Sequence, residues 1–221
     1  IGGSKSKVEN FQVLFEATLY KIWHFFDSDV TLLKAAFFTP MIIATLAIIP
    51  IFFLVRKIAG DWGGLVAGTL LAITPFGLTR TVAGFADTDA FNFLFPVLIF
   101  GFLIWSIDTK KIVYKAILAA LAGLSIGLYS FSWGGWMFMV GFSVSLLLAL
   151  IGFKLIKMLI SKKIDISKFY NIGIVTILFL LFSGVSTMMS GSFYYLINSP
   201  KEIFDFVQIK AVAAKTIWPN V

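Results

Sequence analysis

Long apolar stretches separated by short polar connections constrain this chain more than any other feature. A membrane-spanning helix needs about 17 to 25 predominantly apolar residues, and stretches near that length occur at residues 32–55, 63–79, 91–107, 112–129, 136–153 and 169–189. The composition agrees, because 59% of the residues are hydrophobic, 13% are charged and the mean hydropathy is +0.96. We therefore expect an all-α, polytopic transmembrane helix bundle, with six spanning helices within residues 32–190.

Cysteine content and net charge exclude several classes of function. The chain has no cysteine, so disulfides, thiolate metal ligands, zinc fingers and thiol nucleophiles are excluded. The net charge is +7, but the basic residues fall between apolar stretches and do not share one face. We therefore expect the positive charge to interact with the lipid bilayer, and we expect no nucleic-acid partner. The Ile- and Lys-rich, cysteine-free composition suits a thermophilic archaeon.

The distribution of lysine and arginine predicts the orientation in the membrane. The connections between spans fall alternately on the two sides of the membrane. On one side the short loops hold only Arg80. The connections on the other side hold the first set of basic residues, namely Arg56, Lys57, Lys110, Lys111, Lys115, Lys154, Lys157, Lys162, Lys163 and Lys168. By the positive-inside rule the first set is cytoplasmic. Arg80, Asp87, Asp89 and the 132–135 turn then face outward, so this is a multi-pass protein of the cell membrane with its chemistry on the extracytoplasmic face.

The two ends of the chain are interpreted as external segments. Residues 1–31 hold an amphipathic run typical of a helix in the membrane interface, made of Phe11, Leu14, Phe15, Thr18, Leu19, Ile22 and Phe25. Residues 191–221 start a second external loop, with a capping-box pattern at 199–202. Because the chain begins at Ile1 with no secretory signal, we expect an upstream spanning helix, and more protein after Val221.

Small residues predict where the helices approach one another closely in lipid. They gather at two places, one made of Gly64, Ala67 and Gly68 and the other of Ala119, Ala120, Gly123 and Gly127. No inverted repeat of the kind that marks many secondary transporters is evident.

Residues 80–89 hold an arginine and two aspartates between two apolar spans, and membrane spanning alone does not explain these charges. Carboxylates drawn into hydrocarbon cost roughly 2.5 to 3.5 kcal/mol, so acidic residues at the mouth of a bundle are functional candidates. Asp87 and Asp89 suit Mg²⁺ or Mn²⁺, which prefer hard oxygen ligands. The alternative is that an aspartate here caps the following helix. Arg80 can balance the carboxylates or hold a phosphate oxygen, or it can extend to the membrane interface.

Two motifs give the chain a resemblance to a known family. Residues 80–89, Arg-Thr-Val-Ala-Gly-Phe-Ala-Asp-Thr-Asp, fit the Arg-Thr-x-x-Gly-x-x-Asp-x-Asp/Glu pattern of the oligosaccharyltransferase catalytic subunit in its single-subunit archaeal and bacterial forms. Residues 132–138, Ser-Trp-Gly-Gly-Trp-Met-Phe, look like that family's Trp-Gly-Gly turn two spans later. The resemblance covers nearly the whole chain, as part of a membrane domain of the GT-C type of glycosyltransferase.

The resemblance implies inverting, metal-dependent transfer of an oligosaccharide from a dolichyl or other polyprenyl phosphate carrier to asparagine in Asn-x-Ser/Thr. Asp87 and Asp89 would then hold Mn²⁺ or Mg²⁺, and Arg80 would steady the acidic cluster or the phosphate. A first acidic motif, an acidic residue of the fifth external loop and a soluble C-terminal domain would lie outside residues 1–221, so this piece alone should be inactive.

Several alternatives stay open or are set aside. A related lipid-phosphosugar transferase, such as a protein O-mannosyltransferase, would also carry external acidic residues. A cation transporter would need a polar pore lining, whereas span 91–107 offers only Asn92 and Ser106. The acidic segment 27–29 precedes the first span, where an aspartate is expected as a helix cap. His24 and Trp133 are assigned no site role.

Overall fold

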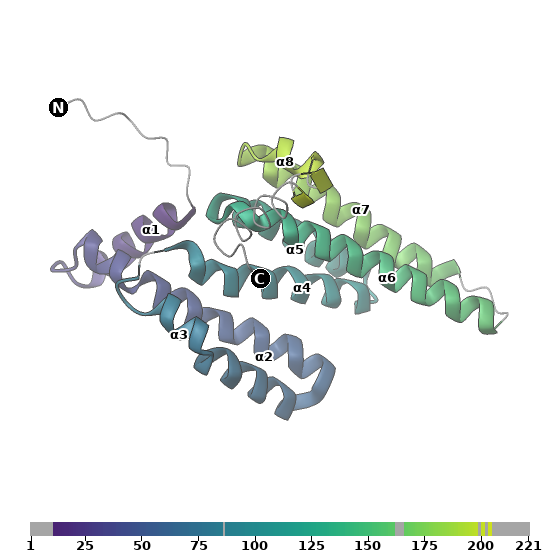
Figure 1. Cartoon of the computed structure of the whole chain (residues 1–221), viewed down its shortest axis with the longest axis horizontal. Helices are drawn as coiled ribbons and strands as arrows, with labels where there is room; N and C mark the ends of the chain where they lie inside the picture. The colour runs from purple at the N-terminus through teal and green to yellow at the C-terminus, as the bar shows by residue number, and fades with distance from the viewer. Residues whose placement is uncertain (1–10, 86, 162–165, 199, 202, 205–221) are drawn as a thin grey trace, which may run out of the picture.

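The computed structural model describes residues 11–85, 87–161, 166–198, 200–201 and 203–204. The regular elements in these residues are all helical, which confirms the predicted fold class; they are α1 (Phe11–Phe26), α2 (Leu32–Ile73), α3 (Pro75–Thr81), η1 (Thr88–Ala90), α4 (Phe91–Asp108), α5 (Ile112–Ser132), η2 (Gly134–Trp136), α6 (Met137–Ser161), α7 (Ile166–Met189) and α8 (Phe193–Ile197). The long helices lie beside one another as a bundle, with α1 and α8 near its edges (Figure 1).

The first two predicted spans are the two arms of α2. This helix is assigned as 42 continuous residues, but Gly60 has φ 74° and ψ −176°, a conformation that only glycine adopts readily. The chain reverses there (Figure 1), and Gly64 and Gly68 of the second arm lie against Phe52 and Ile48 of the first. The close approach predicted from small residues is therefore present between the arms.

Five helices among the described residues are long and apolar enough to cross a membrane, namely Leu32–Ile73, Thr88–Asp108, Ile112–Ser132, Gly134–Ile160 and Tyr170–Met189. Five are found where the sequence predicts six because the reversal at Gly60 joins spans 32–55 and 63–79 into one assigned helix. The second arm stops at Ile73, and α3 continues it to Thr81 with Pro75 at its start. The chain is thus a multi-pass membrane protein.

Helices α5 and α7 form the most extensive helix pair. Glycines on α5 let the two backbones approach, since a Cβ at Gly123 would lie 2.7 Å from the Ser183 backbone nitrogen and one at Gly127 would overlap Ser186. The Ser186 hydroxyl also donates a hydrogen bond of 2.9 Å to the Gly123 carbonyl. The predicted packing face on the fourth span is therefore correct.

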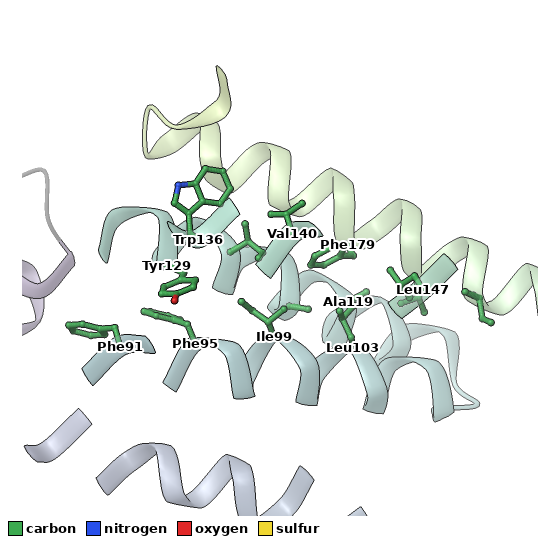
Figure 2. Close-up of a cluster of buried hydrophobic side chains, with 14 of the residues drawn as sticks. Phe91, Phe95, Ile99, Leu103, Ala119, Tyr129, Trp136, Val140, Leu147 and Phe179 are labelled. Carbon is green, nitrogen blue, oxygen red and sulfur yellow. The ribbon is translucent and has the colours of Figure 1, made fainter. Parts of the chain in front are cut away.

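The buried core lies between α4, α5, α6 and α7 (Figure 2). Phe95, Ile99 and Leu103 line one side of α4 and face Ala119 and Tyr129 of α5 (Figure 2). Their spacing of four residues places them on one face of the helix. This core fixes the position of the N-terminal end of α4, where the acidic residues lie.

Helix α1 carries the amphipathic run that the sequence predicts, and one side of it packs against the bundle. Phe11 and Phe15 pack against the bundle, with Phe11 centred 5.5 Å from Phe91 and 5.7 Å from Phe95. Leu14, Ile22 and Phe25 of the same apolar run are exposed instead. One side of α1 therefore covers the start of α4, and the placement of its exposed side in the membrane interface stays a prediction.

The helix cap before the first span is a threonine, not the expected aspartate. Thr31 Oγ1 accepts a hydrogen bond of 3.2 Å from the Lys34 backbone nitrogen, and the Asp27 carboxylate accepts one of 3.1 Å from the Asp29 backbone nitrogen. The aspartates lie too far ahead of the first helical turn, so they order the preceding turn. In the capping box predicted at 199–202, Ser199 and Glu202 lie outside the described residues.

Basic residues gather at the end of the bundle opposite the acidic loop, where Lys57 pairs with Asp108 at 3.0 Å and Arg56 with Asp61 at 2.5 Å. Lys115 is an exception to its predicted place in a connection. It lies in α5, is 2% exposed, and donates a hydrogen bond of 2.6 Å from Nζ to Asn171 Oδ1 on α7. Lys162 and Lys163 lie outside the described residues, as does the side chain of Lys168.

Candidate active site

The predicted site residues lie between the last turn of α3 and η1, and the loop that joins these two elements is anchored on α2. The Gly84 backbone nitrogen donates a hydrogen bond of 2.7 Å to the Phe37 carbonyl. Gly84 has φ 93°, and a Cβ there would lie 2.7 Å from the Phe37 ring. Both the backbone angle and the lack of space require glycine at this position. The glycine of the 80–89 motif therefore sets the path of the loop.

Asp87 caps the helical segment that follows it. Its backbone is extended, and its Oδ1 accepts hydrogen bonds from the Thr88 backbone nitrogen at 2.6 Å and from the Thr88 hydroxyl at 3.4 Å. The capping role weighed for this aspartate is therefore present. Both of these bonds reach the same oxygen, Oδ1, so the cap and a ligand role for Asp87 are compatible.

Asp89 has different partners, one for each carboxylate oxygen. Arg80 Nη1 lies 3.4 Å from Oδ2, and the Asn92 side-chain amide donates to Oδ1 over 3.4 Å. The Arg80 guanidinium also lies over the Phe85 ring, 5.5 Å from its centre. The structure thus brings Arg80 and Asp89 together, and it places the carboxylate of Asp89 between the end of α3 and the first turn of α4.

Asn92 connects this carboxylate to the buried core. The Tyr129 hydroxyl donates a hydrogen bond of 2.8 Å to Asn92 Oδ1, and Tyr129 is 1% exposed. Its ring lies 5.4 Å from the Phe95 ring (Figure 2). It also stacks on Trp133, with the ring centres 5.8 Å apart. The sequence motifs did not single out either residue; the available signal for Asn92 was a polar side chain in an apolar span, three residues after Asp89.

The Trp-Gly-Gly turn packs against Tyr129 through Trp133. The Trp133 ring covers Gly135, where a Cβ would overlap the indole. The first turn after it is η2, and Trp136 then enters the core with 3% exposure. Trp133, which the sequence assigned no site role, therefore packs on Tyr129, the residue whose hydroxyl donates to Asn92.

The donor set suits a divalent cation only in part. Among the described residues, no group of three His, Cys, Asp or Glu side chains comes together. Mg²⁺ and Mn²⁺ favour about six oxygen ligands, often several of them water. Asp87 and Asp89 offer carboxylate oxygens of the right chemistry on one short loop, and other ligands would have to come from water, substrate or residues elsewhere.

His24 and the 27–29 segment make local contacts in and beside the turn between α1 and α2. His24 is exposed, its Nδ1 lies 3.3 Å from the Val30 carbonyl, and its ring lies 5.2 Å from that of Tyr20. A local hydrogen bond of this kind orders the turn between α1 and α2.

Comparison with known proteins gives matches over most of the chain. The family model described as "Oligosaccharyl transferase STT3, N-terminal" matches residues 3–219. A dolichyl-phosphooligosaccharide-protein glycotransferase of Methanococcus voltae is 32% identical over 220 residues, covering 92% of this chain and 24% of the relative. One of the same name from Methanocaldococcus jannaschii is 39% identical over 94 residues, covering 42% of this chain and 10% of the relative.

A solved structure shares the fold. The crystal structure of an Archaeoglobus fulgidus oligosaccharyltransferase in complex with zinc and sulfate aligns with a TM-score of 0.69 and 20% sequence identity. The alignment covers 97% of this chain and 28% of that protein. The chain therefore spans about a quarter of the length of the Methanococcus voltae and Archaeoglobus fulgidus proteins.

Proposed function

The chain belongs to the STT3 family of oligosaccharyl transferases, and from this premise we propose that it forms part of the membrane domain of an N-glycosylating enzyme. The enzyme moves an oligosaccharide from a dolichyl or similar polyprenyl phosphate to the asparagine nitrogen of Asn-x-Ser/Thr in a polypeptide. The observation that carries this proposal is the pairing at 3.4 Å of Arg80, in the last turn of α3, with Asp89 of η1, two residues after Asp87.

Asp87 and Asp89 are the residues that would hold a divalent cation, Mn²⁺ or Mg²⁺. Such a cation supplies charge stabilisation for the lipid phosphate as it leaves. The two aspartates belong to one loop whose path is fixed by Gly84. Asp89 is 22% exposed at its side chain, so its negative charge is only partly screened by solvent and favours a cation.

The same carboxylates can act on the acceptor. The asparagine amide nitrogen is a poor nucleophile because its lone pair is delocalised into the carbonyl. A carboxylate that accepts hydrogen bonds from the amide N–H groups weakens this conjugation and orients the nitrogen toward the sugar. Transfer with inversion follows if the nitrogen attacks the anomeric carbon from the face opposite the phosphate, the bond from that carbon to the phosphate oxygen breaks, and a carboxylate takes the proton that the nitrogen loses.

Arg80 lies where it can serve either the carboxylate or the donor. Its side chain is 45% exposed and extends from the last turn of α3 beside Asp89. A guanidinium presents several donors in one plane, so Arg80 can keep its ion pair with Asp89 and still donate to a phosphate oxygen. We assign Arg80 to holding the phosphate of the lipid carrier against the acidic loop.

The distribution of basic residues between the two ends of the bundle supports the orientation that we propose. Lys57 and Arg56 lie at the end opposite the acidic loop, with their partners Asp108 and Asp61. Acidic partners contribute little to the positive-inside rule, which depends on lysine and arginine. The proposed site therefore faces the outside of the cell, where secreted acceptor polypeptides emerge.

The test uses the full-length protein in detergent micelles or nanodiscs with a lipid-linked oligosaccharide and Mn²⁺. A fluorescent Asn-x-Thr peptide should be glycosylated, a matched Gln-x-Thr peptide should not, and a chelator should stop transfer. Asp89→Asn should abolish transfer while the protein elutes as the native enzyme on size exclusion. Modification of Ser/Thr acceptors without any at Asn-x-Thr would indicate the related O-mannosyltransferase activity instead, and undiminished transfer by Asp89→Asn would refute the site assignment.

A further inference from the structure

The acidic residue nearest the core is held by side chains that the proposed function does not use. Asn92 donates to Asp89 Oδ1, Tyr129 donates to Asn92 Oδ1, and the Tyr129 ring is fixed by packing. We propose that Asn92 and Tyr129 are positioning residues that set the orientation of the Asp89 carboxylate for divalent-cation binding. This inference rests on the proposed metal role of Asp89.

The direction of the hydrogen bonds supports an oriented chain. An ionised carboxylate can only accept, so the Asn92 group facing Asp89 must be the NH₂. Its carbonyl oxygen then faces away and accepts from the Tyr129 hydroxyl at 2.8 Å. If the amide were reversed, two oxygens would face each other at the carboxylate. The order Tyr129 to Asn92 to Asp89 is therefore fixed by chemistry.

The packing of Tyr129 holds in place the first residue of this series of hydrogen bonds. The residue is 1% exposed on α5 and is enclosed by Phe95 of α4 and Trp133 of the Trp-Gly-Gly turn. A buried hydroxyl without a partner would be unfavourable by about 1 to 3 kcal/mol, so Asn92 is the group that satisfies it. The two helices cannot shift relative to each other without breaking this bond.

The contacts at Asp89 orient the carboxylate without saturating it. Arg80 and Asn92 each lie 3.4 Å from a different oxygen, which is longer than the usual range for such bonds. Each carboxylate oxygen has a second lone pair, so a cation can bind while both contacts remain. Groups that orient a metal ligand in this way typically change metal affinity by about 10- to 100-fold when they are removed.

The experiment measures Mn²⁺ binding directly. Full-length protein is freed of metal with a chelator, and MnCl₂ is added while electron paramagnetic resonance follows the six-line signal of free aqueous Mn²⁺. We expect Asn92→Leu to raise the Kd about tenfold, at the lower end of the range for such groups. Tyr129→Phe should raise it only about threefold, below that range, because Tyr129 acts on Asp89 through Asn92. Because Tyr129 acts on Asp89 only through Asn92, the Kd of the double variant should match that of Asn92→Leu alone.

The matched control is Tyr114→Phe, a tyrosine that is 56% exposed at the opposite end of the same helix. It should bind Mn²⁺ with the Kd of the native protein. Thermal unfolding is recorded for every variant. If Asn92 and Tyr129 served only to stabilise the fold, their variants would unfold at lower temperature with an unchanged Kd.

The outcomes separate this inference from the proposed function. If Asp89→Asn loses Mn²⁺ binding but Tyr129→Phe and Asn92→Leu bind as the native protein does, the positioning role is wrong and the metal assignment stands. Full additivity of the two substitutions would also overturn the positioning chain. If Asp89→Asn binds Mn²⁺ normally, the metal assignment and the positioning role both fail.

Discussion

Asp87 is the residue at which helix capping and metal binding predict different responses to the same substitutions. Its Oδ1 accepts a bond of 2.6 Å from the Thr88 backbone nitrogen, at the start of the apolar helical span Thr88–Asp108. Asparagine caps helices about as well as aspartate but carries no charge, whereas alanine has no oxygen to offer. Asp87→Asn and Asp87→Ala therefore separate the two roles.

The two roles of Asp87 predict different effects of these substitutions on stability and on the rate of transfer. Asp87→Ala removes the cap and should lower the free energy of unfolding by about 1 kcal/mol. Asp87→Asn keeps the cap and loses only the attraction of the charge to the helix N-terminus, about 0.3 kcal/mol at an exposed side chain. If the charge holds a cation, both variants should slow transfer at least about 100-fold, which is about 2.7 kcal/mol of activation free energy.

The assay compares initial rates of peptide glycosylation by the full-length enzyme at saturating Mn²⁺ with thermal unfolding of the same preparations. The stability order should be native, then Asn, then Ala, while the rates of the two variants should be similarly low. Asp27→Asn is the control, because Asp27 accepts a hydrogen bond of 3.1 Å in a turn between α1 and α2. A near-native rate for Asp87→Asn, with a rate for Asp87→Ala that follows its loss of stability, would leave capping as the whole role of Asp87.

Three predictions concern the bundle and are checked by reversible unfolding in mixed micelles. Gly123→Ala should destabilise by about 1 to 3 kcal/mol, since the new Cβ would lie 2.7 Å from the Ser183 backbone nitrogen, whereas Gly173→Ala meets no atom within 4 Å and should be neutral or stabilising. Gly60→Ala should destabilise by about 1 to 3 kcal/mol through its backbone angles alone, because nothing lies within 4 Å of a Cβ there; an unchanged stability would contradict the hairpin turn. Asn171→Leu should destabilise more than Lys115→Met, because it leaves the buried Nζ without the oxygen it contacts at 2.6 Å; the opposite order would refute that reasoning.

Local patterns in the sequence were sufficient for several features of the structure. Apolar length predicted the spanning helices, and small residues at helical spacing predicted the close contacts at Gly64, Gly68, Gly123 and Gly127. These predictions work because a helix places residues at fixed intervals on one face, whatever it packs against. The 80–89 motif likewise predicted that Arg80 and Asp89 lie near each other; Arg80 is in the last turn of α3 and Asp89 is in η1, nine positions later.

Features that depend on contacts between helices were missed. The sequence placed Lys115 in a connection, but packing against α7 buries it beside Asn171, 56 positions away. It also expected an aspartate cap before the first span, whereas the helix begins at Leu32 and Thr31 caps it. Exact helix ends depend on which residues the neighbouring helices can cover, and one sequence does not state this.

By itself the sequence determined an apolar helix bundle with an arginine and two aspartates on one loop, because hydrophobic period and motif spacing act over a few residues. Only the tertiary structure decided that Asp87 caps, that Asp89 lies between Arg80 and Asn92, and that Tyr129 reaches Asn92 from 37 positions away. That last contact exists because the packing of α4 against α5 brings two polar groups together in an apolar core, where each must find a partner.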